Sequence, residues 1–348
     1  NHMKTTSISS TLSPQVQPSM ESLTMEAIVT TAYGGPDVLQ LQRVPKPQPA
    51  ENQVLIKIHA TSVTAAQMAM RTGYPLLGRL FMGLTKPKMA ISGTDYSGEI
   101  VQVGEGTTKF KVGDEVFGST DIGGGCYAEY VVVSEDEVIL HKPTNINHNE
   151  ASAINDGLTT SYPFLVHAAQ LGPGQHILIN GASGSIGTAA VQLAKHLGAE
   201  VTGVCSGRNS AMVKGLGADH VIDYTQEDFT QKGVPYDVIF DTVGKSSFRK
   251  AKGSLKAKGL FLSPVLDLGL LGRMLWTSVF GKKKAIFMAT GLRKSEEKLA
   301  DFEAIRVLLA EGKVQAVIDR TYRLGQMREA HTYVDKGHKR GNVVVEMG

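Results

Sequence analysis

Residues 177–187 read ILINGASGSIG, and this stretch decides the fold. A short apolar run, typical of a buried strand, leads into a turn with three glycines. Residues 185–197 then place apolar side chains at helical spacing. A strand, a glycine-rich turn and a helix in this order can hold the diphosphate of a dinucleotide, because the helix N-terminus offers free N–H groups and a positive dipole end.

The glycine spacing is Gly-x-x-Gly-x-x-Gly and not the commoner Gly-x-Gly-x-x-Gly, so the pattern alone is weak. Gly184 lies where the backbone must approach a diphosphate, and Gly187 lets the helix pack against the strand. The alternative is a tight turn in a sheet that binds nothing. The strand before the turn and the helix after it favour the dinucleotide site.

Outward from this turn, strand and helix patterns alternate toward the C-terminus. The strands are expected at residues 177–179, 201–205, 221–222, 238–240 and 260–262. Such alternation predicts an α/β, doubly wound parallel sheet of the Rossmann type.

Toward the N-terminus the pattern changes to short β segments separated by Gly and Asp. Residues 54–58 alternate with period two, and similar runs follow at 100–103, 112–117 and 127–133. These runs predict a β-rich, barrel-like domain. After Gly291 an amphipathic helix (299–309) precedes β-like segments at 317–318 and 343–345, which are expected to complete that domain. The predicted domains are therefore 25–155 with 291–348, and 156–290.

The first 24 residues differ from the rest. Residues 1–3 resemble a cloning scar, and residues 4–24 are rich in Ser, Thr, Pro and Gln, which predicts a disordered tail. An organelle-targeting segment is the weaker alternative, because the tail contains no Arg. The chain has no run of about 18 apolar residues, so no membrane span is expected. Two cysteines give no disulfide framework and indicate a reducing compartment, the cytoplasm.

The charge balance argues against nucleic acid as a partner. Thirty-six Lys and Arg against 33 Asp and Glu leave a net charge of +3, too little for a dense basic face. The one basic run, residues 282–284, is interpreted as a solvated turn. The apolar segment 264–287 predicts a pocket wall or the edge of a homodimer, and burial for stability explains it equally well.

The end of the second strand bears on the choice of cofactor. An NAD site carries an acidic residue there, bonded to the ribose 2′-hydroxyl. Here Ser206 and Arg208 follow the strand, and Glu200 lies at its other end. A guanidinium and hydroxyl groups suit a 2′-phosphate, which favours NADPH. The alternative is that Arg208 is an ordinary surface charge.

Zinc is not expected. Catalytic zinc needs three protein ligands and structural zinc needs four. Cys126 and Cys205 fall in different predicted domains, and the ten histidines show no ligand-type pairing.

The ordered motifs give the chain a family likeness: it resembles the zinc-independent quinone oxidoreductase branch of the medium-chain dehydrogenase/reductase superfamily from about Met25 onward. Besides the glycine turn, the motifs are HATSV (59–63), GTDYSG (93–98), VGDEV (112–116), GLTT (157–160), LGAD (216–219), VIDY (221–224) and DTVG (241–244). The resemblance implies a GroES-like catalytic domain beside the Rossmann domain. Thr94 stands where zinc-dependent relatives carry a histidine ligand.

The resemblance also implies site residues. It places Gly184, Ser185 and Ile186 at the pyrophosphate, Ser206, Arg208 and Tyr224 at the 2′-phosphate, Thr159, Thr242, Val243 and Gly244 at the nicotinamide and its ribose, and Asn342 at a late cofactor contact.

The sequence departs from the family's pattern at residues that are expected close to the nicotinamide. Relatives often show an Asn-x-x-Asp pair where this chain has Thr64 and Gln67, and Ala69 replaces a tyrosine found in some of them. The expected reaction is hydride transfer from NADPH to a quinone or an α,β-unsaturated carbonyl, with Thr64 and Tyr74 as candidate donors to the developing oxyanion. A structural role for Tyr74 beside Pro75 is equally compatible, and the proton can come from water.

Two other functions were weighed. An alcohol dehydrogenase is disfavoured by the missing zinc ligands. An NADPH-binding regulatory or structural protein with little turnover stays open because the Asn-x-x-Asp pair is replaced.

Overall fold

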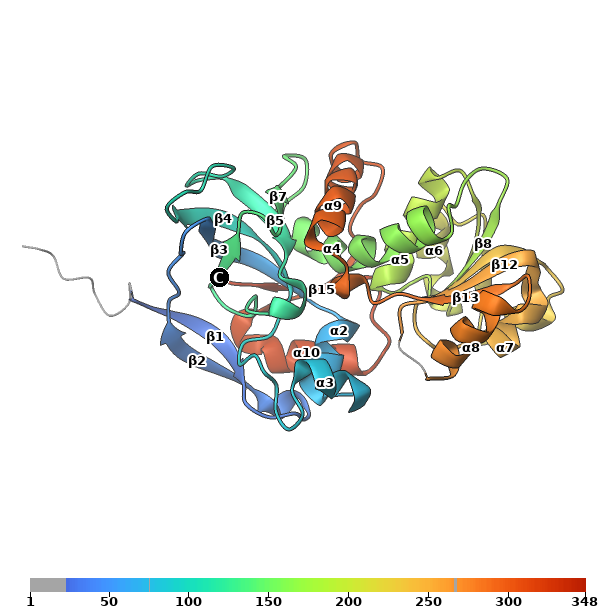
Figure 1. The fold of residues 1–348 in the computed structure, drawn as a ribbon, viewed down its shortest axis with the longest axis horizontal. Coiled ribbons are helices and arrows are strands. Elements are labelled where there is room, and N and C mark those ends of the chain that lie inside the picture. Colours follow the sequence, from blue (N-terminus) through green and yellow to red (C-terminus); the bar gives the residue numbers. More distant parts are fainter. Residues whose placement is uncertain (1–22, 75, 266–267) are drawn as a thin grey trace, which may run out of the picture.

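The computed structural model describes residues 23–74, 76–265 and 268–348. Figure 1 shows a β-rich part that holds both the first and the last described strands, and an α/β part beside it. Residues 1–22 of the predicted tail lie outside the described residues. Thr24 was assigned to the tail, but it begins β1 (Thr24–Thr30), because its backbone pairs with Pro45 at the end of β2 (Leu39–Pro45).

The β-rich part contains a seven-stranded sheet with the order β14-β15-β3-β4-β5-β7, in which β6 also pairs with β3. Its strands are β3 (Gln53–Val63), β4 (Asp95–Val103), β5 (Glu115–Ser119), β6 (Tyr130–Ser134), β7 (Val138–His141), β14 (Ile318–Arg323) and β15 (Asn342–Glu346). The C-terminal strands β14 and β15 thus lie in the same sheet as β3, β4 and β5. Helices α2 (Ala65–Thr72), α3 (Arg79–Met82) and α10 (Met327–Asp335) belong to the same part.

The α/β part is built on a six-stranded parallel sheet with the order β10-β9-β8-β11-β12-β13. Its strands are β8 (His176–Asn180), β9 (Glu200–Cys205), β10 (His220–Asp223), β11 (Tyr236–Asp241), β12 (Leu255–Ser263) and β13 (Lys284–Phe287), and its helices are α5 (Ser185–His196), α6 (Ser210–Gly215), α7 (Phe248–Ala251) and α8 (Leu268–Val279). This confirms the predicted Rossmann-type sheet. The edge strand β13 was missed, because its first residue, Lys284, is also the last residue of the lysine run that indicated a turn.

Both faces of this sheet are covered. Ile177 and Ile179 pack with α5 in one core cluster, whereas Leu178 packs with α7 and α8 in another. Successive side chains of a strand point to opposite faces, so strands of this sheet need apolar residues at every position. This explains the continuous apolar run that precedes the glycine turn.

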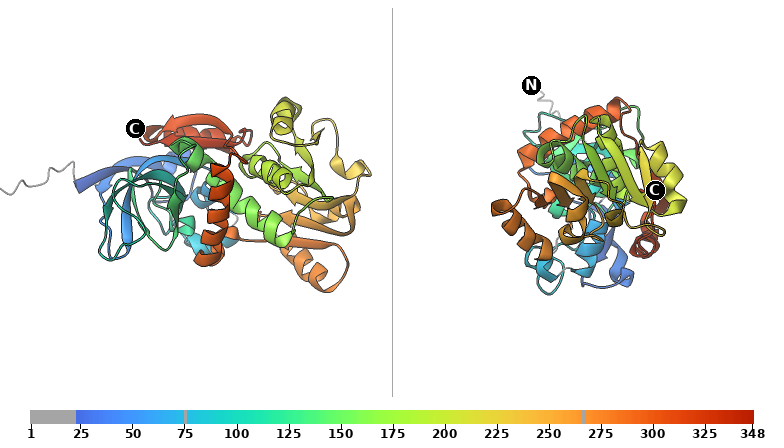
Figure 2. Two further views of the ribbon diagram at one scale, coloured as in Figure 1. Left: turned by 90° about the horizontal axis from the view of Figure 1, so that it is seen from above. Right: turned by 90° about the vertical axis from the view of Figure 1, so that its right-hand side faces the viewer.

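Helix α4 (His148–Tyr162) joins the two parts. It contacts β3, β4 and β15 on one side and α5 on the other, and it packs with α9 (Ser295–Ala310). Figure 2 shows α4 and α9 between the two sheets. The predicted boundary between residues 155 and 156 falls inside α4, because a capping box at Asn147 and Glu150 starts one continuous helix there. Residues just before and just after that boundary therefore belong to one helix.

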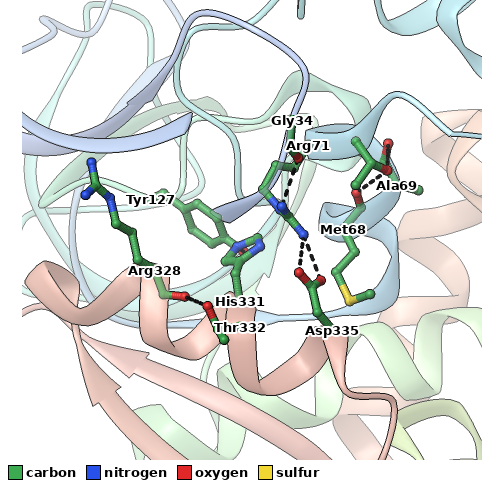
Figure 3. A network of polar contacts seen from close by, with 10 residues as sticks. Gly34, Met68, Ala69, Arg71, Tyr127, Arg328, His331, Thr332 and Asp335 are labelled. Atoms are coloured by element: carbon green, nitrogen blue, oxygen red, sulfur yellow. Dashed lines mark hydrogen bonds and ion pairs between the residues drawn. The ribbon is translucent and has the colours of Figure 1, made fainter. Parts of the chain in front are cut away.

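An ion pair between the buried Arg71 and the exposed Asp335 links α2 to α10 (Figure 3). The Arg71 guanidinium, 3% exposed, donates to both carboxylate oxygens of Asp335 at 2.7 Å and to the Gly34 carbonyl oxygen at 2.9 Å. Beside it, the ring of His331 contacts the Tyr127 hydroxyl at 3.2 Å, and burial together with the nearby Arg71 charge lowers the pKa of His331 to about 3. His331 is therefore neutral, and Arg71 has its counter-charge in Asp335.

Candidate cofactor and active site

The carboxyl ends of β8 and β11 lie side by side beneath the glycine turn. Asn180 pairs in register with Asp241, and the two side chains form a 3.0 Å hydrogen bond. The Thr242 hydroxyl donates to the Asn180 carbonyl oxygen at 2.8 Å. A Cβ added to Gly181, whose φ is +83°, would lie 2.6 Å from Val243 Cγ1. Residues 242–244 and the glycine turn thus form one continuous edge.

Two glycines of the turn have different surroundings. A Cβ at Gly187 would lie 2.7 Å from Ala182 Cα and closer still to the Gly181 carbonyl oxygen, so the turn packs on α5 without room for a side chain. A Cβ at Gly184 would find no heavy atom nearer than 3.5 Å. The space before the N-terminus of α5 is therefore open at Gly184, which fits a bound anion.

The C-terminal segment of the β-rich part reaches this turn. The Gly341 N–H donates to the Ser183 carbonyl oxygen at 2.7 Å, and Gly184 and Gly341 form a β-bridge. The Asn342 amide donates to the Val317 carbonyl oxygen at 3.1 Å, while its Oδ1 is buried without a hydrogen-bond partner. A buried acceptor without a partner is rare in proteins, and a ribose hydroxyl is a donor that could satisfy it.

The predicted 2′-phosphate residues lie at the ends of β9 and β10. Ser206 is partly buried and accepts from the Asn209 amide at 3.3 Å, and the Tyr224 side chain is exposed. The exposed Arg208 donates to the His338 carbonyl oxygen at 3.4 Å, so the loop after α10 lies beside it. These side chains remain accessible to a ligand at this edge.

Sequence reasoning missed an acid at this edge, Asp223 at the end of β10. A Cβ at Gly207 would clash with its carboxylate. Its Oδ1 accepts from the Thr225 N–H at 3.0 Å and from the Thr225 hydroxyl at 2.8 Å, and these bonds and the Gly207 amide hold the pKa of Asp223 below its usual range. The acid of an NAD site is expected at the end of the second strand, whereas this one comes from the adjacent third strand. The sequence signal for this acid was the aspartate of the motif VIDY (221–224).

Helix α4 brings two polar residues to the amino end of α5. A Cβ at Gly157 would lie 2.7 Å from the Ser185 carbonyl oxygen, so the two helices pack closely there. The Ser185 hydroxyl donates to Asp156 at 3.1 Å, and burial raises the pKa of Asp156. One turn further along, the partly buried Thr159 donates to the Asn155 carbonyl oxygen at 2.9 Å. The sequence predicted Thr159 but not Asp156.

Thr64 is buried, 1% exposed, and caps α2. Its Oγ1 accepts from the Ala66 N–H at 3.2 Å, and Gln67 Oε1 accepts both the Thr64 N–H, at 2.7 Å, and the Thr64 hydroxyl. The Gln67 amide in turn donates to Thr94 Oγ1 at 2.6 Å. The sequence Thr-x-x-Gln is itself a capping-box pattern and a local signal for the start of a helix. The sequence analysis interprets these two residues only as a replacement of the Asn-x-x-Asp pair of relatives.

Asp95 connects this chain of hydrogen bonds to α4. Its carboxylate accepts from the Ser62 hydroxyl at 3.0 Å, from the Asn155 amide at 3.1 Å and from Thr94 Oγ1 at 3.4 Å. Burial and the nearby Asp156 raise the pKa of Asp95 well above its usual range. The hydrogen bonds thus run from the cap of α2 through β4 to the helix beside the cofactor edge.

Tyr74 does not join these hydrogen bonds. It follows α2 with 71% of its side chain exposed. The alternative role beside Pro75 lies outside the described residues. The candidate donors Thr64 and Tyr74 therefore differ: one is buried in the hydrogen-bonded chain and the other faces solvent.

A cavity of about 240 Å³ lies elsewhere in the α/β part. Residues of α7, α8 and β12 line it, among them Phe248, Arg249, Phe261 and Leu270. The segment 264–287 thus supplies one wall of a pocket. A pocket wall is one of the three roles that the sequence analysis gives for this segment. Gly244 of the cofactor edge also lines this pocket.

Residues 23–74, 76–265 and 268–348 contain no group of three or more His, Cys, Asp or Glu side chains that could hold a metal ion. No helix within these ranges is long and apolar enough to span a membrane.

Comparison with known proteins gives the chain a family. Residues 50–144 match the family described as "Alcohol dehydrogenase GroES-like domain", and residues 216–345 match "Zinc-binding dehydrogenase". The chain is 33% identical over 339 residues to the chloroplast envelope quinone oxidoreductase homolog of Arabidopsis thaliana, covering 92% of this chain and 98% of the relative. It is 32% identical over 371 residues to the mitochondrial NAD(P)H oxidoreductase RTN4IP1 of Homo sapiens, covering 94% and 91%.

A solved structure supports the same assignment. The quinone oxidoreductase from Coxiella burnetii superposes with a TM-score of 0.82 at 28% identity, over 93% of this chain and 100% of that chain. The resemblance inferred from the motifs is confirmed: the chain is an oxidoreductase and belongs to the quinone oxidoreductase branch of the medium-chain dehydrogenase/reductase superfamily.

Proposed function

We propose that the protein reduces quinones or α,β-unsaturated carbonyls by hydride transfer from NADPH, without zinc. The observation that carries this proposal is the edge described above. There the open glycine turn and the accessible Arg208 follow the carboxyl ends of two neighbouring parallel strands, and Gly341, next to the partnerless Asn342 Oδ1, is bonded to the turn. Relatives described as quinone oxidoreductases and as an NAD(P)H oxidoreductase support the reaction class and a nicotinamide cofactor.

The preference for NADPH rests on charge. Arg208 is exposed at the end of β9, whereas the oxygens of the nearby Asp223 are occupied by Thr225 and the Gly207 amide. A permanently charged guanidinium pairs well with a phosphate dianion. Asp223 is then a structural carboxylate and not the ribose-binding acid of an NAD site.

Changing Arg208 to alanine should weaken NADPH binding by about 1.5–3 kcal/mol, the scale of a hydrogen bond to a charged group, and leave NADH binding nearly unchanged. Fluorescence titration with both cofactors measures the two affinities. Lys214→Ala, which removes an exposed charge from the neighbouring α6, serves as the control and should change neither. Equal losses for NADPH and NADH would contradict the assignment of Arg208.

In the proposed reaction, NADPH supplies the hydride when it is bound. The chain's own residues orient the cofactor and exclude water, and a donor stabilises the developing oxyanion. We propose Thr64 for that role, with Tyr74 as the second candidate. The Thr64 hydroxyl would have to turn from Gln67 Oε1 toward the substrate.

The proposed reaction is tested by NADPH oxidation with a panel of quinones and enones, repeated after dialysis against a strong chelator. We expect turnover with at least one class, unchanged by the chelator and without stoichiometric zinc in metal analysis. Turnover that needs one zinc per chain would contradict the metal-free mechanism. Tight NADPH binding without turnover on any acceptor would favour the alternative, a regulatory or structural NADPH-binding protein.

We also propose a homodimer in a reducing compartment. Strand β13 ends the six-stranded sheet, and beside it α8 exposes Leu275, Trp276 and Val279. An exposed apolar patch of this kind suits pairing across a two-fold axis. Both cysteines are free and buried, which suits the cytoplasm or an organelle interior, and the relatives named above are described as chloroplastic and mitochondrial.

A further inference from the structure

The loop between α10 and β15 (residues 336–341) is fixed at the cofactor edge by contacts on both sides. Asp335, which precedes it, holds Arg71 (Figure 3). Within the loop, the Arg340 N–H donates to Asp319 Oδ2 at 2.9 Å, and the Gly341 N–H donates to the Ser183 carbonyl oxygen at 2.7 Å. The β-rich part therefore presents this loop to the glycine turn in a defined position.

Lys339 is the partly buried cation of this loop. Its ammonium donates to the Gly341 carbonyl oxygen at 2.6 Å, and among the described residues no carboxylate lies within ion-pairing distance of it. Burial lowers the pKa of Lys339 to about 8, against the opposing influence of Asp156 and Asp319. A desolvated ammonium without an ion pair is unfavourable unless an anion arrives to compensate it.

The position of Lys339 relative to α5 indicates which anion that is. Gly341, to which Lys339 is bonded, forms the β-bridge with Gly184, the glycine before the amino end of α5. The backbone N–H groups of α5 come from the α/β part, and Lys339 comes from the β-rich part. Asp156 places a negative charge near the same helix end through its hydrogen bond with Ser185. An additional cation there would favour the binding of a diphosphate.

We propose that Lys339 is a cofactor-binding residue whose ammonium pairs with the diphosphate bridge of the dinucleotide, so that the catalytic domain itself holds the cofactor's phosphates. The inference rests on the proposed function, because it requires a dinucleotide at the glycine turn. It differs from the role of Arg208, since the diphosphate is common to NADH and NADPH whereas the 2′-phosphate is not.

The experiment compares Lys339→Gln with the unaltered protein and with Lys339→Arg, using titrations with NADPH, NADH and adenosine 2′-monophosphate. Lys339→Gln should weaken both dinucleotides about 10-fold or more, by equal factors, which is the scale of one charge-assisted hydrogen bond. Adenosine 2′-monophosphate carries no diphosphate and should bind equally well to both proteins. Lys339→Arg, which keeps the charge, should restore most of the affinity.

Lys336→Gln provides the matched control, because it removes an exposed lysine from the same loop. It should change both affinities less than about 2-fold, since an exposed charge is screened by solvent and salt. Thermal melting checks that each variant is folded, and Lys339→Met, which keeps the aliphatic stem, replaces Lys339→Gln if that variant is unstable.

The outcomes separate the two proposals. If the unaltered protein binds neither dinucleotide, the proposed function fails and this inference fails with it. If the unaltered protein binds both and Lys339→Gln binds them equally well, only the role of Lys339 is refuted. A loss confined to NADPH and adenosine 2′-monophosphate would overturn the diphosphate assignment and place Lys339 at the 2′-phosphate.

Discussion

Replacing Gly187 with alanine should lower the free energy of unfolding by about 2–4 kcal/mol and reduce binding of both dinucleotides. The added methyl group would lie 2.7 Å from Ala182 Cα and nearer still to the Gly181 carbonyl oxygen. Both are backbone atoms, so no side-chain rotation can relieve the overlap. The amino end of α5 must move away from the strand that positions it. Urea denaturation and cofactor titration measure the two effects.

Gly184→Ala is the matched control, because a Cβ at that position meets nothing closer than 3.5 Å and the φ of −86° suits alanine. This variant should unfold like the unaltered protein. It should nevertheless bind NADPH and NADH about 10- to 100-fold more weakly, because the methyl group occupies the space open to the diphosphate. Normal binding by Gly184→Ala would contradict the placement of the diphosphate, and unchanged stability of Gly187→Ala would show that the turn can relax.

Changing Thr64 to valine should reduce kcat roughly 10- to 1000-fold if its hydroxyl stabilises the transition state, the range for loss of one oxyanion donor. The affinity for NADPH should change much less. Thr64 also caps α2, so the same change should lower the free energy of unfolding by about 0.5–2 kcal/mol. Steady-state kinetics well below the melting temperature separate the two consequences.

Thr64→Ser keeps both the hydroxyl and the cap, and it should retain most of the activity and stability. If Thr64→Val loses stability but keeps its turnover, Thr64 is only the cap of α2. The oxyanion donor would then be Tyr74 or solvent, and Tyr74→Phe would be the next variant to measure.

The sequence allowed the α/β part to be predicted closely because its signals are local. The apolar run of β8, the three glycines and the periodicity of α5 all lie within residues 176–196, and the structure keeps them where the pattern placed them. The capping box at Thr64 and Gln67 was equally local and was available, but we did not recognise it. Strand β13 was too short, and too close to a lysine run, for its pattern to stand out.

By itself the sequence determined the alternation of strands and helices from β8 to β12, the glycine turn, the absence of an acid after β9, and the family, because each depends on neighbouring residues or on motif order. Only the tertiary structure placed Asp223 beside Gly207, linked Asp95 to Asn155, and set Lys339 near the amino end of α5. These contacts join residues that are far apart in the chain. Their charges and hydrogen bonds depend on burial and distance, which arise only when the two sheets pack against α4.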